Sequence, residues 1–288
     1  MAVSDDRSVA LCRIVLRLEL RRLREAKEMN ASFVAKKFGW STARMTRLET
    51  QNSSIEVPDV KALCELYEAP RELQEQLESF ALITKTRKDW WETQPFKGTV
   101  PHWFQAFLGL ESAASQIRIY QSEFTPGLAQ TPDYARVILS LSDTSPEALE
   151  RKAEVRLKRQ SILTRSAHAP QVAIILNEAV IWRPVGGQAV MRQQLDSILA
   201  LAEQPNVIIR VLPYSAGAHP AMHGPFQILS FTDETVGDLV YLENLVDAGV
   251  LADAQQVAPY VQAFDALSDL ATTTAESVEM IRSRAAAL

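Results

Sequence analysis

The sequence NASFVAKKFGWSTARMTRLE, residues Asn30–Glu49, decides how the first part of the chain folds. Its pattern predicts two short helices joined by a tight turn. Asn30 can cap the first helix, because its side-chain oxygen can accept from a backbone N–H one turn later. Val34 lies on the apolar face of that helix, and Gly39 can take the left-handed conformation that ends it. Ser41 can cap the second helix.

The second helix is expected to expose small hydroxyl side chains and arginines beside an apolar stripe of Met45 and Leu48. Such side chains suit base edges and phosphates in a DNA major groove. An ordinary helical hairpin fits the same spacing. Arg44 is expected to read bases, and Arg47 to make mainly a phosphate or structural contact. The residues predicted to contact DNA are Asn30, Ser32, Ser41, Thr42, Ala43, Arg44, Thr46 and Arg47.

Positive charge gathers near the N-terminus of a chain whose formal net charge is −5. Residues 7–47 hold eleven Lys and Arg against three Glu, a local charge of +8, so the remainder carries −13. A basic segment that coincides with a candidate recognition helix predicts an anionic partner. The run RLELRRLREAKE taken alone fits a solvated helix face equally well.

A length of 288 residues suits one large or two ordinary domains, and 47% hydrophobic residues suffice for real cores. No apolar run reaches the roughly 18 residues of a membrane span. The N-terminal MAVSDDRS does not resemble a signal peptide, so we expect a cytoplasmic protein. Cys12 and Cys64 have no His or Cys close by in sequence, and we expect buried free thiols.

The remaining pattern predicts two domains with different secondary structure. Residues 1–88 are expected to be all-α, residues 89–104 an aromatic-rich connection, and residues 105–288 a mixed α+β domain. Helices are predicted at 7–28, Asn30–Lys37, Ser41–Gln51, from Pro58, Arg71–Lys88, Pro132–Leu141, Pro146–Leu163, Gly187–Ala202, Ala252–Leu270 and Thr274–Arg284. Strands are predicted at Gln116–Glu123, Val172–Leu176, Val207–Leu212, Phe226–Phe231 and Leu239–Leu242.

The run LRRLREAKEMNASFVAKKFGWSTARMTRLE resembles the helix-turn-helix of the XRE family, the lambda-repressor-like domain. Its part from Gly39 to Glu49 is similar to that family's recognition-helix pattern G-x-S-x-x-x-x-S-R-x-E. The sequence departs from the family where Ala31 replaces a frequent Gln and Ala43 a usual Ser. Gln51-Asn52 also stands in place of a Gly-containing turn. The resemblance implies a lambda-repressor-like fold that binds double-stranded DNA.

Four later segments resemble one further domain, in the same order along the chain. They are FTPGLAQTPDYARVIL, NEAVIWRPVGG, NVIIRVLPYSAGAHPAMHGPF and VYLE. They are similar to the C-terminal domain of a large actinomycete regulator group, which joins an XRE helix-turn-helix to a domain without assigned chemistry. WhiJ-type developmental regulators are examples. The resemblance spans roughly residues 15–285, and it implies a transcription regulator that pairs with a small protein encoded nearby.

The sequence contains none of the patterns GxGxxG, GxxxxGK[ST], HExxH or GxSxG. We therefore predict no catalytic residues and no cofactor. His219 and His223 are four apart, but Pro220 and Gly224 indicate a loop, and the run lacks a further Asp, Glu or Cys ligand. No metal site is predicted.

Four polar residues of the second domain lie at or near predicted strand or loop ends, where they could converge on a ligand. They are Arg183, Arg210, His219 and Glu243. Scattered surface charges and structural ion pairs are the alternative for each of them.

These observations favour a sequence-specific DNA-binding transcription regulator whose second domain binds a partner protein or a small-molecule effector. An enzyme, such as a nucleotide-related one, with an appended DNA-targeting domain is an alternative, and a protein-binding scaffold is another. A homodimer on an inverted repeat is expected, because one helix-turn-helix reads only a short half-site. The start of the first helix carries more apolar side chains than one small helical domain needs, namely Val9, Leu11, Ile14 and Val15. They are candidates for a dimer interface or an interdomain interface, and burial inside the first domain is the alternative. Two interpretations fit Trp90, Trp91 and Trp103: coupling between the two domains, or packing into a static core, which is the plainer one.

Overall fold

The computed structural model describes residues 8–50, 55–142, 145–232, 236–245 and 248–288. The chain forms two compact units. Unit 1 consists of Met1–Pro95 and Gln105–Ala113, and unit 2 consists of Phe96–Phe104 and Ala114–Leu288. This division differs from the domain boundaries predicted at residues 88 and 104. Helix α6 (His102–Ala113) runs across the boundary predicted at residue 104.

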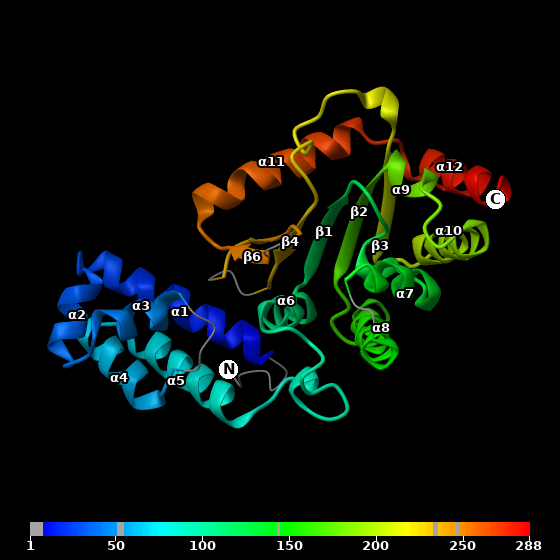
Figure 1. Ribbon diagram of the computed structural model, residues 1–288. Helices are drawn as coiled ribbons and strands as arrows, with labels where there is room; N and C mark the ends of the chain where they lie inside the picture. Colours follow the sequence, from blue (N-terminus) through cyan, green and yellow to red (C-terminus); the bar gives the residue numbers. More distant parts are fainter. Residues whose placement is uncertain (1–7, 51–54, 143–144, 233–235, 246–247) are drawn as a thin grey trace. The chain divides into compact units, whose positions relative to one another are not determined.

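Unit 1 is helical, as the sequence pattern predicts (Figure 1). Its first five helices are α1 (Val9–Ala26), α2 (Ala31–Lys37), α3 (Thr42–Thr50), α4 (Val57–Leu66) and α5 (Arg71–Thr86). A short 3-10 turn, η1, follows at Trp90–Glu92. The apolar stripe of α1 is fully buried at Leu16 and Leu20, together with Val34 of α2 and Met45 of α3. Hydrophobic periodicity therefore located the core of this unit correctly.

Helix α6 approaches the start of α1 so closely that only a glycine fits. A Cβ added at Gly109 would lie 2.1 Å from Cβ of Ala10 and 2.9 Å from Oγ of Ser8. The neighbouring residues Val9 and Leu11 are buried within the chain, as are Ile14 and Val15. Their burial favours the interpretation that this apolar surface is packed within the chain over the interpretation that it forms a dimer interface.

Unit 2 contains one six-stranded mixed sheet with the strand order β3-β2-β1-β4-β5-β6. The strands are β1 (Gln116–Gln121), β2 (Gln171–Asn177), β3 (Val207–Leu212), β4 (Phe226–Ser230), β5 (Leu239–Glu243) and β6 (Ala248–Leu251). Strands β1, β2 and β3 are parallel, whereas β4, β5 and β6 continue the sheet as an antiparallel meander. This arrangement confirms the mixed α+β class of the second domain.

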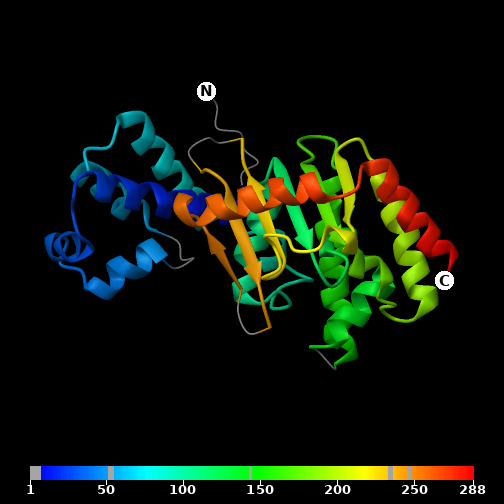
Figure 2. The ribbon, with the colours of Figure 1, turned by 90° about the horizontal axis from the view of Figure 1, so that it is seen from above.

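Helices pack on the sheet of unit 2. They are α7 (Pro132–Ser140), α8 (Pro146–Gln160), α9 (Glu178–Trp182), α10 (Gln188–Ala202), α11 (Ala254–Leu270) and α12 (Thr274–Ala286). Figure 2 shows α11 passing over the strands, where its Phe264 and Leu267 join a core with Tyr120 and Ile228. Helices α7, α8 and α10 lie on the other side of the sheet (Figure 1), and α12 packs on α10 and β3. Strand β6 and helices α6 and α9 were not predicted.

Candidate nucleic-acid interface

Helices α2 and α3 are joined by a tight turn whose geometry follows from its residues. Asn30 caps α2, because its Oδ1 accepts from the backbone N–H of Phe33 at 2.8 Å. Gly39 has φ +66° and reverses the chain without a Cβ in the way. Ser41 then caps α3, since its Oγ accepts from the backbone N–H of Arg44 at 3.1 Å. The predicted helix-turn-helix is thus present at the predicted residues.

One face of α3 is buried and the opposite face is open. Met45 and Leu48 point into the core of unit 1. The exposed side chains at and after the N-terminus of this helix are Ser41, Thr42, Ala43, Arg44, Thr46 and Arg47. Asn30 and Ser32 at the start of α2 are exposed as well. All eight residues predicted to contact DNA are therefore exposed.

A buried ion pair fastens α3 to α1. Nε and Nη2 of Arg24 donate to the two carboxylate oxygens of Glu49 at 2.6 and 2.9 Å. Nη1 of Arg24 donates to the carbonyl of Met29 at 2.6 Å, which fixes the entry into α2. Hydrogen bonding to Glu49 raises the pKa of the Arg24 guanidinium. Glu49 thus fastens α3 to α1.

Arg44 is held by two neighbours that the sequence did not reveal. Its Nη2 lies 2.6 Å from Oδ2 of Asp59, in the first turn of α4. Its guanidinium also lies 4.2 Å from the ring centroid of Trp40, which stacks on Phe38 with centroids 4.9 Å apart. The arginine predicted to read bases is therefore pre-oriented by an aromatic surface and a carboxylate. Asp59 is fifteen residues away along the chain, so no local pattern could have indicated this contact.

Much of the positive charge counted in residues 7–47 is balanced inside unit 1. Acids outside the segment pair with three of its cations: Glu49 with Arg24 at 2.6 Å, Glu68 with Lys27, and Asp59 with Arg44 at 2.6 Å. Arg7 lies outside the described residues. The exposed cations on α2 and α3 are Lys36, Lys37, Arg44 and Arg47. The charge available to an anionic partner is thus smaller than the local count of +8, but it is concentrated on the two helices of the motif.

The four residues predicted to form a ligand site in unit 2 have four different partners. Exposed Arg183 lies 2.5 Å from Glu123 as a surface ion pair. Glu243, at the end of β5, accepts from the hydroxyl of Tyr241 at 3.0 Å. These two contacts match the reading of surface charges and structural ion pairs at least as well as a ligand site.

Arg210 and His219 have structural neighbours too. Arg210 lies inside β3 rather than at its end, and it donates to the carbonyls of Ala271 and Thr272 at 2.6 and 2.7 Å, which fixes the link between α11 and α12. His219 Nε2 is 3.5 Å from the hydroxyl of Tyr120, and burial lowers the pKa of the imidazole. Within the described residues, the other ring nitrogen of His219 is buried without a hydrogen-bond partner.

The motif FTPGLAQTPDY forms the loop after β1, and two glutamines, buried Gln194 and half-buried Gln160, hold its backbone. Gln194 on α10 accepts from the N–H of Thr131 at 2.7 Å and donates to the carbonyl of Ala129 at 2.6 Å. Gln160 on α8 donates to the carbonyls of Gly127 and Gln130 at 3.0 and 2.7 Å. These bonds satisfy a loop that would otherwise bury unpaired backbone groups. The motif thus has a clear structural role.

Cys12 and Cys64 are buried free thiols, and burial raises the pKa of Cys64 to about 11. No group of three His, Cys, Asp or Glu side chains suited to a metal ion occurs among the described residues. Among those same residues, no helix is both long and apolar enough to cross a membrane.

The capped helix pair, the buried stripe of α3 and its exposed polar face define a helix-turn-helix protein. A family profile described as a helix-turn-helix domain matches residues 15–77, which indicates a DNA-binding regulator. A second profile, described as "Domain of unknown function (DUF5753)", matches residues 104–283. Because that match covers more than half of the 288 residues, the chain belongs to the family of proteins that carry this domain. No curated protein and no solved structure matches the chain.

Proposed function

We propose that the protein is a sequence-specific transcription regulator that places α3 in the DNA major groove. The observation that carries this proposal is the exposed N-terminal half of α3, with hydroxyl and guanidinium groups, on a helix locked from behind by Arg24 and Glu49. Recognition helices of this architecture contact base edges through their N-terminal residues. The cytoplasm, where the DNA of a bacterium lies, is the proposed compartment.

The exposed residues divide into base-reading and phosphate-contacting groups. Arg44 is proposed to donate to a base edge, with Ser41, Thr42, Ala43 and Thr46 beside it. Arg47 is proposed to contact a phosphate. Asn30 and Ser32 at the N-terminus of α2 suit a second phosphate, because a helix start offers free N–H groups and a positive dipole end.

A homodimer on an inverted repeat remains part of the proposal. One α3 reads only a short half-site, and a two-fold dimer would place two such helices about 34 Å apart, one turn of DNA. Because Val9 and Leu11 are buried within the chain, the dimer must use other surfaces.

Unit 2 is proposed to bind a small-molecule effector or a partner protein, such as a small protein encoded nearby, and not to catalyse a reaction. The resemblance to XRE-family regulators of actinomycetes, WhiJ-type proteins included, supports this assignment. The predicted ligand residues Arg183, Arg210, His219 and Glu243 and the coupling through Trp90, Trp91 and Trp103 stay proposals. The side chain of Trp103 lies outside the described ones. An effector would change DNA affinity by favouring one arrangement of the two units.

The test is selection of binding sites from a random duplex pool by the full chain, followed by titration against salt. We expect enrichment of one sequence. Three cations, Lys36, Lys37 and Arg47, should give a slope of log K against log salt of about −2.7 per half-site. Lys36→Gln with Lys37→Gln should reduce that slope by about 1.8 and keep the sequence ranking. A matched control is Arg71→Gln, at the exposed first position of α5, and it should leave the salt slope unchanged. The proposal is wrong if no sequence is enriched.

A further inference from the structure

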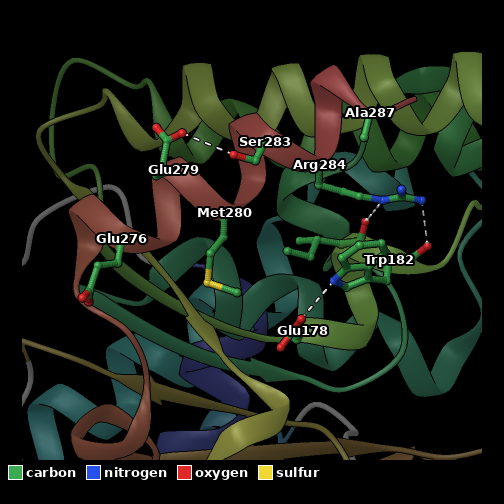
Figure 3. A pocket seen from close by; sticks show the side chains of 9 residues that line it. Glu178, Trp182, Glu276, Glu279, Met280, Ser283, Arg284 and Ala287 are labelled. Carbon is green, nitrogen blue, oxygen red and sulfur yellow. Dashed lines mark hydrogen bonds between the residues drawn. The ribbon is translucent and has the colours of Figure 1, made fainter.

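A pocket of about 480 Å³ opens between α9 and α12 of unit 2 (Figure 3). Its apolar wall consists of Ile181, Trp182 and Met280, and carboxylates come from Glu178, Glu276 and Glu279. The α12 residues that line it recur every three or four positions, from Glu276 to Ala287, whereas Ser277 and Ile281, outside this stripe, are buried. The volume lies within the roughly 300–1,000 Å³ of small-molecule sites.

The aromatic wall is fixed before any ligand arrives. The indole N–H of Trp182 donates to Oε1 of Glu178 at 3.0 Å. The guanidinium of Arg284 lies 4.5 Å from the ring centroid of Trp182 and donates to the carbonyls of Ile181 and Trp182 at 3.4 and 3.3 Å. Trp182 nevertheless remains 49% exposed, so apolar ring surface is still open to a partner.

The polar groups of the pocket favour a cation. Of its three carboxylates, Glu279 is paired with Arg282 at 2.9 Å, and the two oxygens of Glu178 accept from the indole N–H of Trp182 and the backbone N–H of Tyr214. Glu276 is therefore the carboxylate that is left for a ligand. The Arg284 guanidinium is already stacked on Trp182 and bonded to the end of α9. In Figure 3 it points away from Met280 and Glu276. Both bonds from Thr273 to Glu276 reach Oε2, and these bonds lower the pKa of the Glu276 carboxyl, so it is ionised at neutral pH. The end of the pocket around Met280 is thus apolar and negatively charged.

We propose that this pocket binds a small organic cation, an alkylammonium whose hydrocarbon body lies on Trp182 and Met280. Its ammonium group lies at Glu276, whose carboxylate accepts its protons. The hydrocarbon body gains from burial against the apolar wall. This inference gives unit 2 of the proposed regulator a ligand class. It rests on the proposed function only for the regulatory consequence of binding.

The substitution Glu276→Gln isolates the charge from the fold. Glu276 and Thr273 form a capping box at the start of α12, and Gln serves that role as well as Glu. The variant therefore keeps the helix and removes one negative charge. Glu203→Gln, at the exposed C-cap of α10 outside the pocket, is the matched control for the charge change.

The test is calorimetric titration of three ligands into the full chain without DNA: hexylammonium, 1-hexanol and hexanoate. Because no DNA is present, a negative result for the pocket is distinguishable from a failure of the protein to bind DNA. We expect one hexylammonium per chain, hexanol about tenfold weaker, and no hexanoate binding. Glu276→Gln should weaken hexylammonium about tenfold, Trp182→Ala should abolish binding, and Glu203→Gln should change nothing.

The proposal fails if hexylammonium does not saturate at concentrations on the order of 10 mM. Equal affinity for hexanol and hexylammonium, unaffected by Glu276→Gln, would also overturn it, because the pocket would then be apolar without cation recognition. A third contrary result is binding of a lysine-containing peptide without binding of the free amine, since the pocket would then be part of a protein interface.

Discussion

Breaking the buried pair between Arg24 and Glu49 should destabilise unit 1 far more than loss of a surface ion pair. The two side chains are 10% and 7% exposed, and three hydrogen bonds of 2.6–2.9 Å converge on the guanidinium. Glu49→Gln leaves the buried guanidinium with only a 3.4 Å contact to exposed Glu25 as counter-charge, and loss of a buried partner costs about 3–5 kcal/mol of the free energy of unfolding. We expect a value near the lower end, about 3 kcal/mol, because the carbonyl of Met29 still accepts from Arg24.

The comparison that isolates the pair is a double-mutant cycle. The double variant Arg24→Met with Glu49→Leu removes both charges together. It should therefore lower the free energy of unfolding clearly less than the sum of the losses from Arg24→Met and Glu49→Leu made singly. The control pair Arg71 and Glu75 on α5 is 92% and 64% exposed, and Arg71→Gln should stay within about 0.5 kcal/mol of the unaltered chain.

The assay is hydrogen exchange of the amides of α1 and α3 in the full chain across a urea series. Exchange follows these helices individually, whereas the two units need not unfold together. The reasoning is refuted if Glu49→Gln lowers the protection of α3 by less than about 0.5 kcal/mol, or if the double variant costs as much as the summed singles.

Three further outcomes follow from particular contacts. Gly109→Ala should lower the melting temperature in calorimetry and cost about 2 kcal/mol or more of the free energy of unfolding. The new Cβ would lie 2.1 Å from Cβ of Ala10, and this clash outweighs a helix-propensity gain of about 1 kcal/mol. The control Gly249→Ala, whose Cβ would meet nothing within 4 Å, should be nearly neutral. Burial, together with the charge of Glu92, raises the pKa of Asp89 from 3.8 to about 6, so the folded state binds this proton more tightly and stability falls as pH rises from 4 to 6. Asp89→Asn should therefore stabilise the chain at pH 7.5 by up to about 3 kcal/mol and have little effect at pH 4; equal effects in urea melts at both values would contradict this assignment. Asp59→Asn removes a negative charge beside α3, so affinity for random duplex DNA should rise about threefold in fluorescence titrations, while preference for the selected site should fall because Arg44 loses an orienting partner; an unchanged preference would contradict that orienting role.

The sequence was sufficient for most helices and strands, because their apolar residues follow the period of each element. Leu16 and Leu20, four apart on α1, and the alternating or continuous apolar runs of β1 to β5 all appear where the pattern placed them. Strand β6, with only AGVL, and the five-residue helix α9 are too short for periodicity to identify. Helix α6 begins inside the aromatic stretch taken as a connection, and its packing on Ala10 depends on a contact that lies far along the chain.

The candidate DNA interface was more predictable than the ligand site, for a physical reason. Exposure on α3 follows from the local stripe of Met45 and Leu48. In contrast, Arg210 donates to carbonyls more than sixty residues away, and the sheet order that creates such contacts has no local sequence pattern. The pocket beside Trp182 was missed because its two walls, α9 and α12, lie about a hundred residues apart.

The most direct test of the central claim, that α3 reads DNA sequence, compares site selection by the full chain with selection by its Arg44→Ala variant. Arg44 is exposed at the start of α3 and pre-oriented by Trp40 and Asp59. The variant should bind the selected site about 1–3 kcal/mol more weakly and lose preference at one position of each half-site, while other positions keep theirs. If Arg44→Ala leaves both the affinity and the ranking of sequences unchanged, α3 does not read DNA through Arg44 and the account is contradicted.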